Sequence, residues 1–429
     1  MKILHIIPGS GGSFYCGNCL RDSKYVPALK ALGHEVVKIP MYLPLFANND
    51  EASDTPIFYG AVSIYLKQLY PVFRKAPEWV DNVLNAKPLL KLAAKYSGST
   101  DAKGLEEMTV SMLMGEEGQQ SEELERMVDW IAGHYKPDII HLSNALLLGL
   151  AFTLKRRLKT VVICSLQDED VWIDVMEPTF RDQIWGLMQK SVAYVDGFVA
   201  VSDYYAERMK IRMQIPLQKL ASIHIGVDPA DYFPQPINAK KRAIGFVSRM
   251  CHDNGLDILV DGFIALKKRE GFADVTLVIT GGATGADTQY INKIKADIRK
   301  NNLTDQVFFH EEFSGEGLKA FFGKVSVISV PVRNGEAFGI YLLEAMASGV
   351  PVIQPALGAF PEIIRISGGG VLYEPNQPDA LTQVLADTLS NPALLLKLSL
   401  AGIKGVETSF NISTQASKMV DYYGQFKEQ

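Results

Sequence analysis

The sequence predicts an α/β protein made of two doubly wound domains, each a parallel sheet covered by helices. A chain of 429 residues suits two domains of roughly 200 residues better than one core. Short β-branched runs also alternate with longer helix-like segments, and this pattern occurs twice along the chain. We therefore expect two domains that face a cleft.

Short apolar runs in each half are expected to form the strands of the two sheets. In the first half they are 3–7, 35–39, 139–141, 161–164, 197–201 and 221–225, and in the second half 243–248, 276–280, 307–310, 325–330, 352–354 and 371–373. Between the halves, the proline-rich segment 228–240 predicts a hinge. We expect the first domain over residues 1–235 and the second over residues 236–405.

Two segments do not follow the alternation of strands and helices. Residues 44–120 carry aromatic and amphipathic stretches, and we interpret them as an insertion in the first domain. The insertion is expected to pack on its own domain, and peripheral contact with a membrane surface is the alternative. Residues 411–426, within the last segment 406–429, have helical spacing.

Charge and hydropathy argue against two classes of protein. The net charge is -5, from 43 basic and 48 acidic residues, so the basic face of a nucleic-acid-binding protein is not expected. The longest apolar stretch, 145–154, has about half the length that crosses a bilayer. The N-terminal apolar run stops at Pro8 and is too short for a signal peptide.

The cysteines point to a reducing compartment. Only four are present and no secretory signal precedes them, so we expect free thiols and a cytoplasmic location. Cys16 and Cys19 have C-x-x-C spacing, which suits zinc or redox chemistry, but Cys164 and Cys251 stand alone and supply no second ligand pair. Small residues packed near a glycine loop are the other interpretation of the pair.

A glycine-rich loop follows the first expected strand. Gly11 and Gly12 lie in the segment 9–13, just before a helix that runs to about residue 32. Glycines let the backbone approach a phosphate closely, and a helix N-terminus supplies N–H groups and partial positive charge. The third glycine of the dinucleotide fingerprint would fall at Phe14, which argues against a nicotinamide or flavin enzyme. A tight turn without a ligand remains the alternative.

Two carboxylates eight residues apart form the most informative pattern. Glu336 lies in a loop after an expected buried strand, and Glu344 lies on the helix 341–348 that follows. Glu336 suits hydrogen bonds from sugar hydroxyls and Glu344 from a ribose, while the backbone amides between them suit phosphate oxygens. The pattern therefore favours a sugar-nucleotide site. Alone, Glu344 would be interpreted as an acid on a helix surface.

The E-x7-E motif of Glu336 and Glu344 resembles that of glycosyltransferase family 4, the retaining enzymes that include sucrose synthase and bacterial mannosyltransferases. Supporting segments are the glycine loop, 225–228 with Phe233, 245–249 and 278–282. The resemblance implies a GT-B fold, with two Rossmann-like domains and a C-terminal helix, 406–429, that crosses back to the first domain. It implies no cofactor, no metal, and a nucleotide-sugar donor that is UDP- or GDP-linked.

The resemblance also assigns the site residues. Arg249 matches the family's arginine that clamps the donor diphosphate, but Asn254 stands where the family has a lysine, and Gln167 where it has a histidine. Glu336, Arg249 and Gln167 are therefore the expected catalytic residues. The expected donor-binding residues are Gly11, Gly12, Arg249, Asn254, Gly281, Glu336, Ala337, Phe338, Gly339, Ile340 and Glu344.

The expected function is transfer of a sugar from the donor to a glycan, lipid or small-molecule acceptor with retention. The diphosphate itself can accept the proton of the acceptor, so no protein nucleophile is required. Asp168, Glu169, Asp170 and Asp174 suit acceptor hydroxyls or, less readily, a metal. The alternatives are a protein that binds nucleotide sugar without catalysis, which the changes at Gln167 and Asn254 favour, and another GT-B enzyme such as an epimerase or a phosphorylase.

Overall fold

The computed structural model describes residues 1–8, 17–41 and 104–427, with the side chains of residues 17–20 left out. The chain forms two compact units, which are described separately below. Of the described residues, 1–8, 18–41, 104–223 and 416–427 belong to the first unit, and Gly17 and 224–415 belong to the second.

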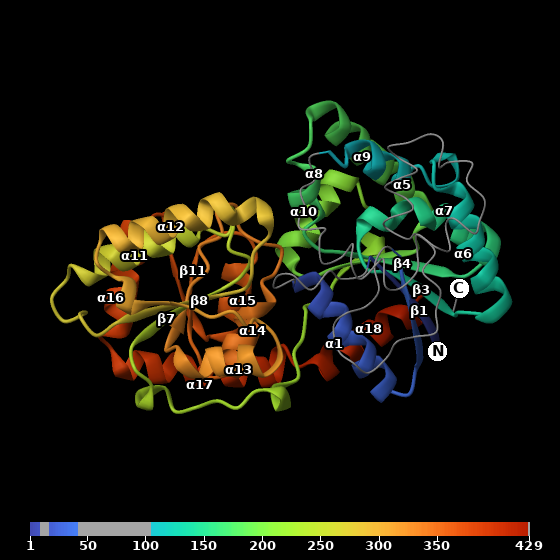
Figure 1. The fold of residues 1–429 in the computed structure, drawn as a ribbon. Coiled ribbons are helices and arrows are strands. Elements are labelled where there is room, and N and C mark those ends of the chain that lie inside the picture. The colour runs from blue at the N-terminus through green and yellow to red at the C-terminus, as the bar shows by residue number, and fades with distance from the viewer. Residues whose placement is uncertain (9–16, 42–103, 428–429) are drawn as a thin grey trace. The chain divides into compact units, whose positions relative to one another are not determined.

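Each unit contains one parallel six-stranded sheet (Figure 1). The first sheet has the order β2-β1-β3-β4-β5-β6 and the second the order β12-β11-β10-β7-β8-β9. The strands of the first sheet are β1 (Lys2–Ile7), β2 (Glu35–Pro40), β3 (Ile139–Leu142), β4 (Val161–Leu166), β5 (Gly197–Ala200) and β6 (Leu220–Ser222). Those of the second are β7 (Ala243–Val247), β8 (Thr276–Thr280), β9 (Val307–Phe309), β10 (Val327–Ile328), β11 (Val352–Pro355) and β12 (Gly370–Tyr373). Every expected strand is found, and the doubly wound α/β class is confirmed.

Helices cover both faces of the first sheet, so its central strands are buried on both sides and are mostly apolar. In Figure 1, α1 and α18 lie on one face and α5, α6 and α7 on the other. The helices of this unit are α1 (Gly17–Ala31), α5 (Glu106–Leu113), α6 (Ser121–His134), α7 (Ala151–Leu158), α8 (Glu169–Ile173), α9 (Pro178–Ser191) and α10 (Asp203–Met213). Short 3-10 helices add η2 (Gly115–Glu117), η3 (Ala145–Leu150), η4 (Val192–Tyr194) and η5 (Leu217–Lys219).

The second sheet is covered in the same way. In Figure 1, α11 and α12 lie on one face of the sheet and α13 and α17 on the other. The helices here are α11 (Leu256–Lys267), α12 (Thr288–Lys300), α13 (Gly315–Lys324), α14 (Ile340–Ala347), α15 (Phe360–Ser367), α16 (Pro378–Leu389) and α17 (Pro392–Ser409). The 3-10 helices are η6 (Pro229–Asp231), η7 (Ile237–Ala239), η8 (Gly285–Asp287) and η9 (Thr304–Gln306), and α18 (Ile412–Gly424) ends the chain.

The division between the units corrects the expected domain boundary. The first unit ends at Ile223, not near residue 235. The segment after it is fixed to the second unit, because Val227 forms a β-bridge with Asn411 and the Tyr232 hydroxyl donates to Glu344. Prolines alone could not show this, since they mark where a chain turns and not which domain it packs against.

The last helix, α18, is held by the core of the first unit. The Tyr423 hydroxyl contacts Nδ1 of His141 on β3, and Nε2 of His141 lies 2.6 Å from Oγ of Ser165 on β4. The Tyr422 hydroxyl donates to the carbonyl oxygens of Phe198 and Lys219. The residues from Ala416 onward therefore pack with the strands of the first unit, whereas 406–415 belong to the second.

The insertion that we expected at 44–120 ends earlier than that. Residues 106–117 form α5 and η2, and α5 packs against α9 and η3 within the helix layer of the first unit. Residues 42–103 lie outside the described part of the chain. Among the described helices, none has both the length and the apolar character to cross a bilayer.

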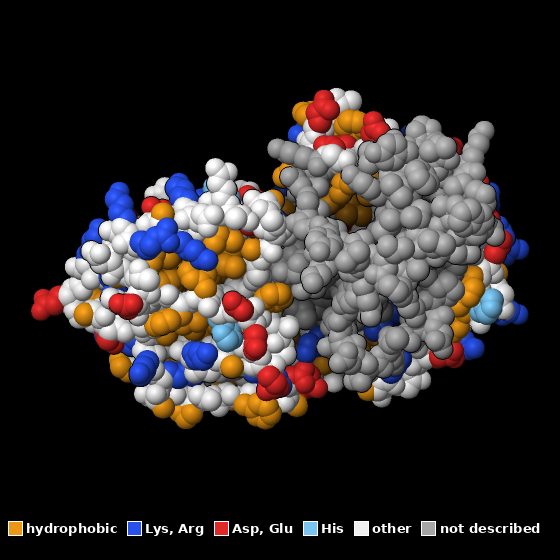
Figure 2. All heavy atoms as spheres, viewed as in Figure 1, with side chains coloured by type: hydrophobic (Ala, Val, Ile, Leu, Met, Phe, Trp, Pro, Cys, Tyr) orange, Lys and Arg blue, Asp and Glu red, His pale blue; other side chains and the backbone are white. Residues whose placement is uncertain are grey.

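Figure 2 shows one face of the molecule, which can be compared with the prediction that no basic face is present. Basic and acidic side chains are interspersed on the described part of that face, with hydrophobic side chains between them. Such a mixture lacks the single-sign field of a phosphate-backbone site.

Candidate active site

The second unit brings two loops together at the point where its strand order reverses. β7 and β10 pair with each other, and the sheet then continues to β8 on one side and to β11 on the other. In open parallel sheets, ligands bind at the carboxyl ends of the strands beside such a reversal. The chain leaves β7 at Ser248 and Arg249, and leaves β10 toward Glu336. The topology therefore places both predicted segments at one sheet edge.

Glycines fix the loop that carries Glu336. Gly335 has φ +75°, and a Cβ on it would lie 2.5 Å from the backbone nitrogen of Gly358. The Ala359 N–H donates to the Glu336 carbonyl oxygen at 3.0 Å, which closes the contact with the loop after β11. Gly339, with φ +88°, is the N-cap of α14. The loop therefore ends at a helix N-terminus, a position that favours anions.

The two predicted carboxylates differ in burial. Glu336 is half-buried, and its Oε2 accepts a hydrogen bond from the Tyr341 hydroxyl at 2.8 Å. Glu344 is 3% exposed, and its Oε1 accepts from the Tyr232 hydroxyl at 3.0 Å. The interpretation of Glu344 as an acid on a helix surface is therefore wrong, since all of α14 is buried. Each carboxylate has a tyrosine hydroxyl to orient it.

Tyr232 remains a hydrogen-bond donor at any pH of interest. Burial raises the pKa of Tyr232 far above that of a free tyrosine, and the charge of Glu344 and the hydrogen bond to it raise the pKa further. A neutral hydroxyl donates to a carboxylate and stabilises its charged form.

Arg249 is held in place by the loop after β8. Its Nε and Nη2 donate to the two carboxylate oxygens of Asp287 at 2.9 and 3.1 Å, and Nη2 also contacts Oγ1 of Thr284 at 2.9 Å. Burial alone would lower the pKa of Arg249, but the hydrogen bonds and the charge of Asp287 raise it above the usual value. The guanidinium is therefore always charged and has a fixed plane.

Asn254, which we predict to bind the donor, forms two hydrogen bonds within the protein. Its Nδ2 donates to Oγ of Ser248 at 2.8 Å and to the carbonyl oxygen of Arg249 at 2.9 Å. An amide nitrogen has two N–H bonds, so both are used within the protein. In this geometry Asn254 holds the turn that carries Arg249.

Gly281 lies where no other residue fits. Its φ is +124°, and a Cβ would lie 2.0 Å from the carbonyl oxygen of Ser248. The Met250 N–H donates to the Gly282 carbonyl oxygen at 3.0 Å. The loop after β8 therefore packs directly on the Arg249 turn, and donor binding by Gly281 stays a prediction.

The remaining predicted donor residues can offer only backbone groups. Ala337, Phe338 and Ile340 are each 2% exposed. The Phe338 ring packs edge-on against Phe410 at 6.1 Å and lies 6.1 Å from the His224 ring. The side chains of this segment are therefore core residues, and its role toward a ligand falls to its N–H groups and to Gly339.

The sequence did not reveal a set of hydrogen bonds that joins the segment after β7 to the loop after β10. Arg333 donates from Nη2 to the Asp257 carboxylate at 2.5 Å and from Nε to the His252 carbonyl oxygen at 3.0 Å. The Tyr290 hydroxyl donates to the other oxygen of Asp257 at 2.8 Å. No local pattern links these residues, which come from three segments. Asp287 had a local signal, since Thr284 and Asp287 form a capping box.

In the first unit, Gln167 lies directly after β4 and is 3% exposed. Its Nε2 donates to the carbonyl oxygen of Ser143 at 2.8 Å, and its N–H donates to Oε2 of Glu169 at 2.7 Å. Asp168, the next residue, has φ +58°, a strained backbone for a residue other than glycine. The segment is thus fixed between the ends of β3 and β4.

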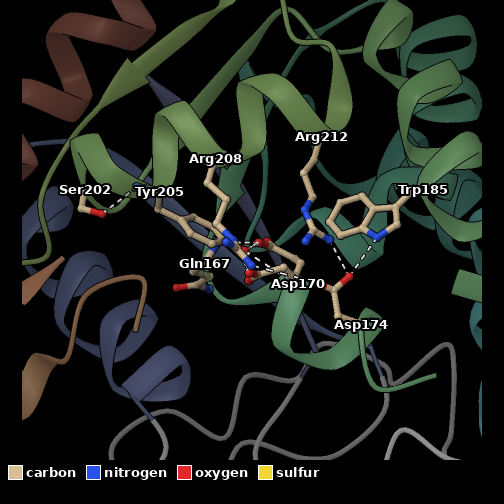
Figure 3. Close-up of polar contacts among 9 residues, drawn as sticks. Gln167, Asp170, Asp174, Trp185, Ser202, Tyr205, Arg208 and Arg212 are labelled. Atoms are coloured by element: carbon tan, nitrogen blue, oxygen red, sulfur yellow. Dashed lines mark hydrogen bonds and ion pairs between the residues drawn. The ribbon is translucent and has the colours of Figure 1, made fainter. Parts of the chain in front are cut away.

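The predicted acidic group binds protein side chains. Figure 3 shows Arg208 and Arg212 of α10 pointing toward Asp170 and Asp174. Arg208 donates to Asp170, and Arg212 donates to Asp174, each at 2.5 Å. The Trp185 indole also donates to Asp174, at 3.2 Å. Among the described residues, no cluster of three metal-ligating side chains occurs.

Several predicted residues lie outside the described part of the chain. These are Gly11, Gly12 and Cys16, together with the side chain of Cys19. His141, at a strand end in the sequence, is fully buried between Tyr423 and Ser165 and has a structural role. Cys164 and Cys251 are free thiols.

Two doubly wound parallel sheets in tandem, with the E-x7-E carboxylates at the reversal point of the second, are the architecture of the GT-B fold. The comparisons agree with this class: residues 228–404 match the model for glycosyl transferases group 1, and residues 113–231 match that for Glycosyltransferase Family 4. Residues 228–404 and residues 113–231 therefore each resemble a glycosyltransferase domain.

Among curated relatives, the chain is 28% identical to the lipopolysaccharide core biosynthesis mannosyltransferase LpcC of Rhizobium leguminosarum bv. viciae over 183 residues, 43% of this chain and 51% of the relative. It is also 28% identical to the D-inositol 3-phosphate glycosyltransferase of Xylanimonas cellulosilytica over 268 residues, 59% of this chain and 61% of the relative. The chain thus spans about half to three fifths of the length of these relatives.

Solved structures resemble the whole chain in fold. Sucrose-phosphate synthase from Thermosynechococcus elongatus has a TM-score of 0.72 at 19% identity, with 99% of each chain covered. Anabaena HepE, solved with UDP, has a TM-score of 0.69 at 15% identity and covers 99% of this chain and 100% of its own.

Proposed function

We propose that this chain is a retaining glycosyltransferase that moves a sugar from a UDP- or GDP-linked donor to an acceptor hydroxyl. One observation carries the proposal: Glu336 and Glu344 lie on either side of the α14 N-terminus, at the sheet edge where Arg249 leaves β7. Carboxylates suit sugar and ribose hydroxyls, and the helix N-terminus and the guanidinium suit a diphosphate.

Each residue has one role in the proposed reaction. Glu344 holds the ribose, with Tyr232 orienting its carboxylate, and Glu336 holds the transferred sugar. Arg249 neutralises the charge that develops on the diphosphate as the sugar–phosphate bond breaks. The acceptor hydroxyl attacks from the face that the nucleotide leaves, and its proton passes to a diphosphate oxygen. No protein nucleophile takes part in this reaction.

The donor base and the acceptor belong to the proposal as well. HepE was solved with UDP, which makes UDP the first nucleotide to test. The acceptor is a glycan, a lipid or a small molecule. The free thiols Cys164 and Cys251 fit a reducing compartment, so we keep the cytoplasm as the proposed location.

A thermal-shift screen against UDP, GDP, ADP and their common sugars tests the donor site. A nucleotide at one hundred times its Kd stabilises the fold by about 2.7 kcal/mol, or roughly 5–10 °C for a domain of this size. The shift is expected for one base, and it should be lost in Glu344→Ala and Arg249→Ala. Glu407→Ala is the matched control, because Glu407 is an exposed acid on α17.

Donor turnover then separates an enzyme from the non-catalytic alternative. That alternative has specific support, since Asn254 and Gln167 replace the family's lysine and histidine and donate within the protein. Slow release of free sugar from the donor that binds, abolished in Arg249→Ala, is the expected result. Binding without any release of sugar or transfer to acceptors would favour the non-catalytic function, and the absence of any nucleotide shift would contradict the proposed site.

A further inference from the structure

Glu169 connects three elements at the end of the first sheet where Gln167 lies. Its Oε1 accepts the N–H of Ala145, the first residue of η3, at 2.8 Å. Its Oε2 accepts the N–H of Gln167 at 2.7 Å and the hydroxyl of Tyr205 on α10 at 2.8 Å. The carboxylate is 2% exposed. Three donors on one buried carboxylate fix the carboxyl ends of the neighbouring strands β3 and β4 relative to each other.

A second link joins the same two strand ends. The Gln167 side chain donates to the Ser143 carbonyl oxygen at 2.8 Å, beside the start of η3. Between Gln167 and Glu169, Asp168 adopts φ +58°. A left-handed conformation of this kind persists only where the surroundings hold it. Because Glu169 accepts the N–H of Gln167 from two residues away, its carboxylate is the group that holds the turn.

The surroundings of Glu169 raise its pKa into the neutral range, so that its charge changes with pH there. Burial raises the pKa of Glu169 to about 7, although hydrogen bonds from Ala145, Tyr205 and Gln167 oppose the increase. Tyr205 from α10 and the thiol of Cys164 from β4 interact with it, and Asp168 and Asp170, the latter paired with Arg208, carry charges close to Tyr205. Figure 3 shows Tyr205 and Arg208 directed at this part of the site.

We propose that Glu169 is a positioning residue, whose ionised carboxylate holds Gln167 and the Asp168 turn in the geometry that transfer of the sugar requires. The inference rests on the proposed function. Protonation of Glu169 removes its negative charge and places an O–H on one oxygen, so the hydrogen bonds that it accepts from Gln167 and Tyr205 weaken or rearrange. Turnover should then depend on pH through a residue that does not touch the substrate.

The experiment measures donor turnover from pH 5.5 to 8.5 for the wild type, Glu169→Gln and Tyr205→Phe, with donor affinity measured alongside. In the wild type, kcat should increase with pH through an apparent pKa near 7. Glu169→Gln should lower kcat at pH 8 by about 10-fold or more, remove the acid limb, and leave donor KM within about twofold. Glu123→Gln is the matched control, because Glu123 is a buried acid of the same unit on α6, 3% exposed, and should keep the wild-type profile.

Tyr205→Phe distinguishes positioning from a purely structural role. The Tyr205 hydrogen bond lowers the pKa of Glu169, so its loss should move the acid limb of kcat to higher pH. A Tyr205→Phe variant that lowers kcat equally at every pH would contradict the inference. If kcat of Glu169→Gln still fell at low pH as in the wild type, this inference would be wrong, whereas the proposed function would stand. Absence of donor turnover in the wild type would instead overturn the proposed function, and this inference with it.

Discussion

The hydrogen bond between Tyr232 and Glu344 allows direct binding by Glu344 to be separated from its structural role. The two side chains are 7% and 3% exposed, and the donor–acceptor distance is 3.0 Å. Glu344→Ala removes the acceptor of a buried hydroxyl, and Tyr232→Phe removes a donor from a buried carboxylate. Each change should cost about 1–3 kcal/mol.

For the second unit, about 1 kcal/mol corresponds to roughly 2–4 °C in Tm. Each single variant should therefore unfold about 2–12 °C lower, as followed by differential scanning calorimetry. The double variant removes donor and acceptor together, so its loss should be smaller than the sum by about 1–3 kcal/mol. Purely additive losses would show that the hydrogen bond does not couple the two residues.

The two single variants should differ in their affinity for the nucleotide. A hydrogen bond from a ribose hydroxyl to a carboxylate is worth about 1.5–3 kcal/mol, so Glu344→Ala should raise the nucleotide Kd about 10- to 150-fold. Tyr232→Phe leaves the carboxylate in place and should raise it only a few-fold. Titration calorimetry measures both. Equal increases in Kd for the two variants would show that Glu344 acts through the structure of the site and not by binding the ribose. An unchanged Kd in Glu344→Ala would refute ribose binding by this residue.

Three further perturbations follow from the described contacts. Asp287→Asn weakens the two hydrogen bonds that orient Arg249, so donor KM should rise about 3- to 30-fold in steady-state assays; an unchanged KM would contradict a role of this pair in donor binding. Gly281→Ala forces a Cβ to 2.0 Å from the Ser248 carbonyl oxygen and should lower Tm by 5 °C or more in calorimetry, whereas a wild-type Tm would refute the close packing. The pKa of Glu169 rises from 4.5 to about 7 on folding, so its contribution to stability is present below pH 4.5 and is lost as pH rises through 7, by about 3 kcal/mol; in Glu169→Gln the Tm should fall less between pH 5 and pH 8, and parallel profiles would contradict this.

The sheets were predictable from the sequence because their signal is local. A strand covered by helices on both faces has a short apolar run at its centre, such as 277–279, and it is recognised without knowledge of its neighbours. The order of the strands was constrained as well, since parallel strands joined by helices allow few topologies. The Glu336 to Glu344 spacing was also visible, because a loop and the helix after it are continuous in sequence.

The partners of the site residues were not predictable, because they come from distant segments. Asn254 and the turn that it holds are close in sequence, but nothing in the sequence shows that its amide faces Ser248 and the Arg249 carbonyl oxygen. Tyr232 lies 112 positions before Glu344. Glu169 was visible only as one of several acids, since its burial depends on how η3 and α10 pack around it.

The charges of the second unit show what the replacement of the family's lysine by Asn254 means for the proposed reaction. Asn254 supplies no positive charge, and the Arg333 guanidinium is paired with Asp257 at 2.5 Å. In the proposed reaction Arg249 stabilises the leaving diphosphate, together with the N-terminus of α14. Asp287 offsets part of its charge, but it also fixes the guanidinium before the donor arrives. A charge that is already oriented requires no reorganisation when the diphosphate leaves. The replacement by Asn254 thus weakens leaving-group stabilisation and keeps one source of it, because the asparagine holds the turn from which Arg249 acts.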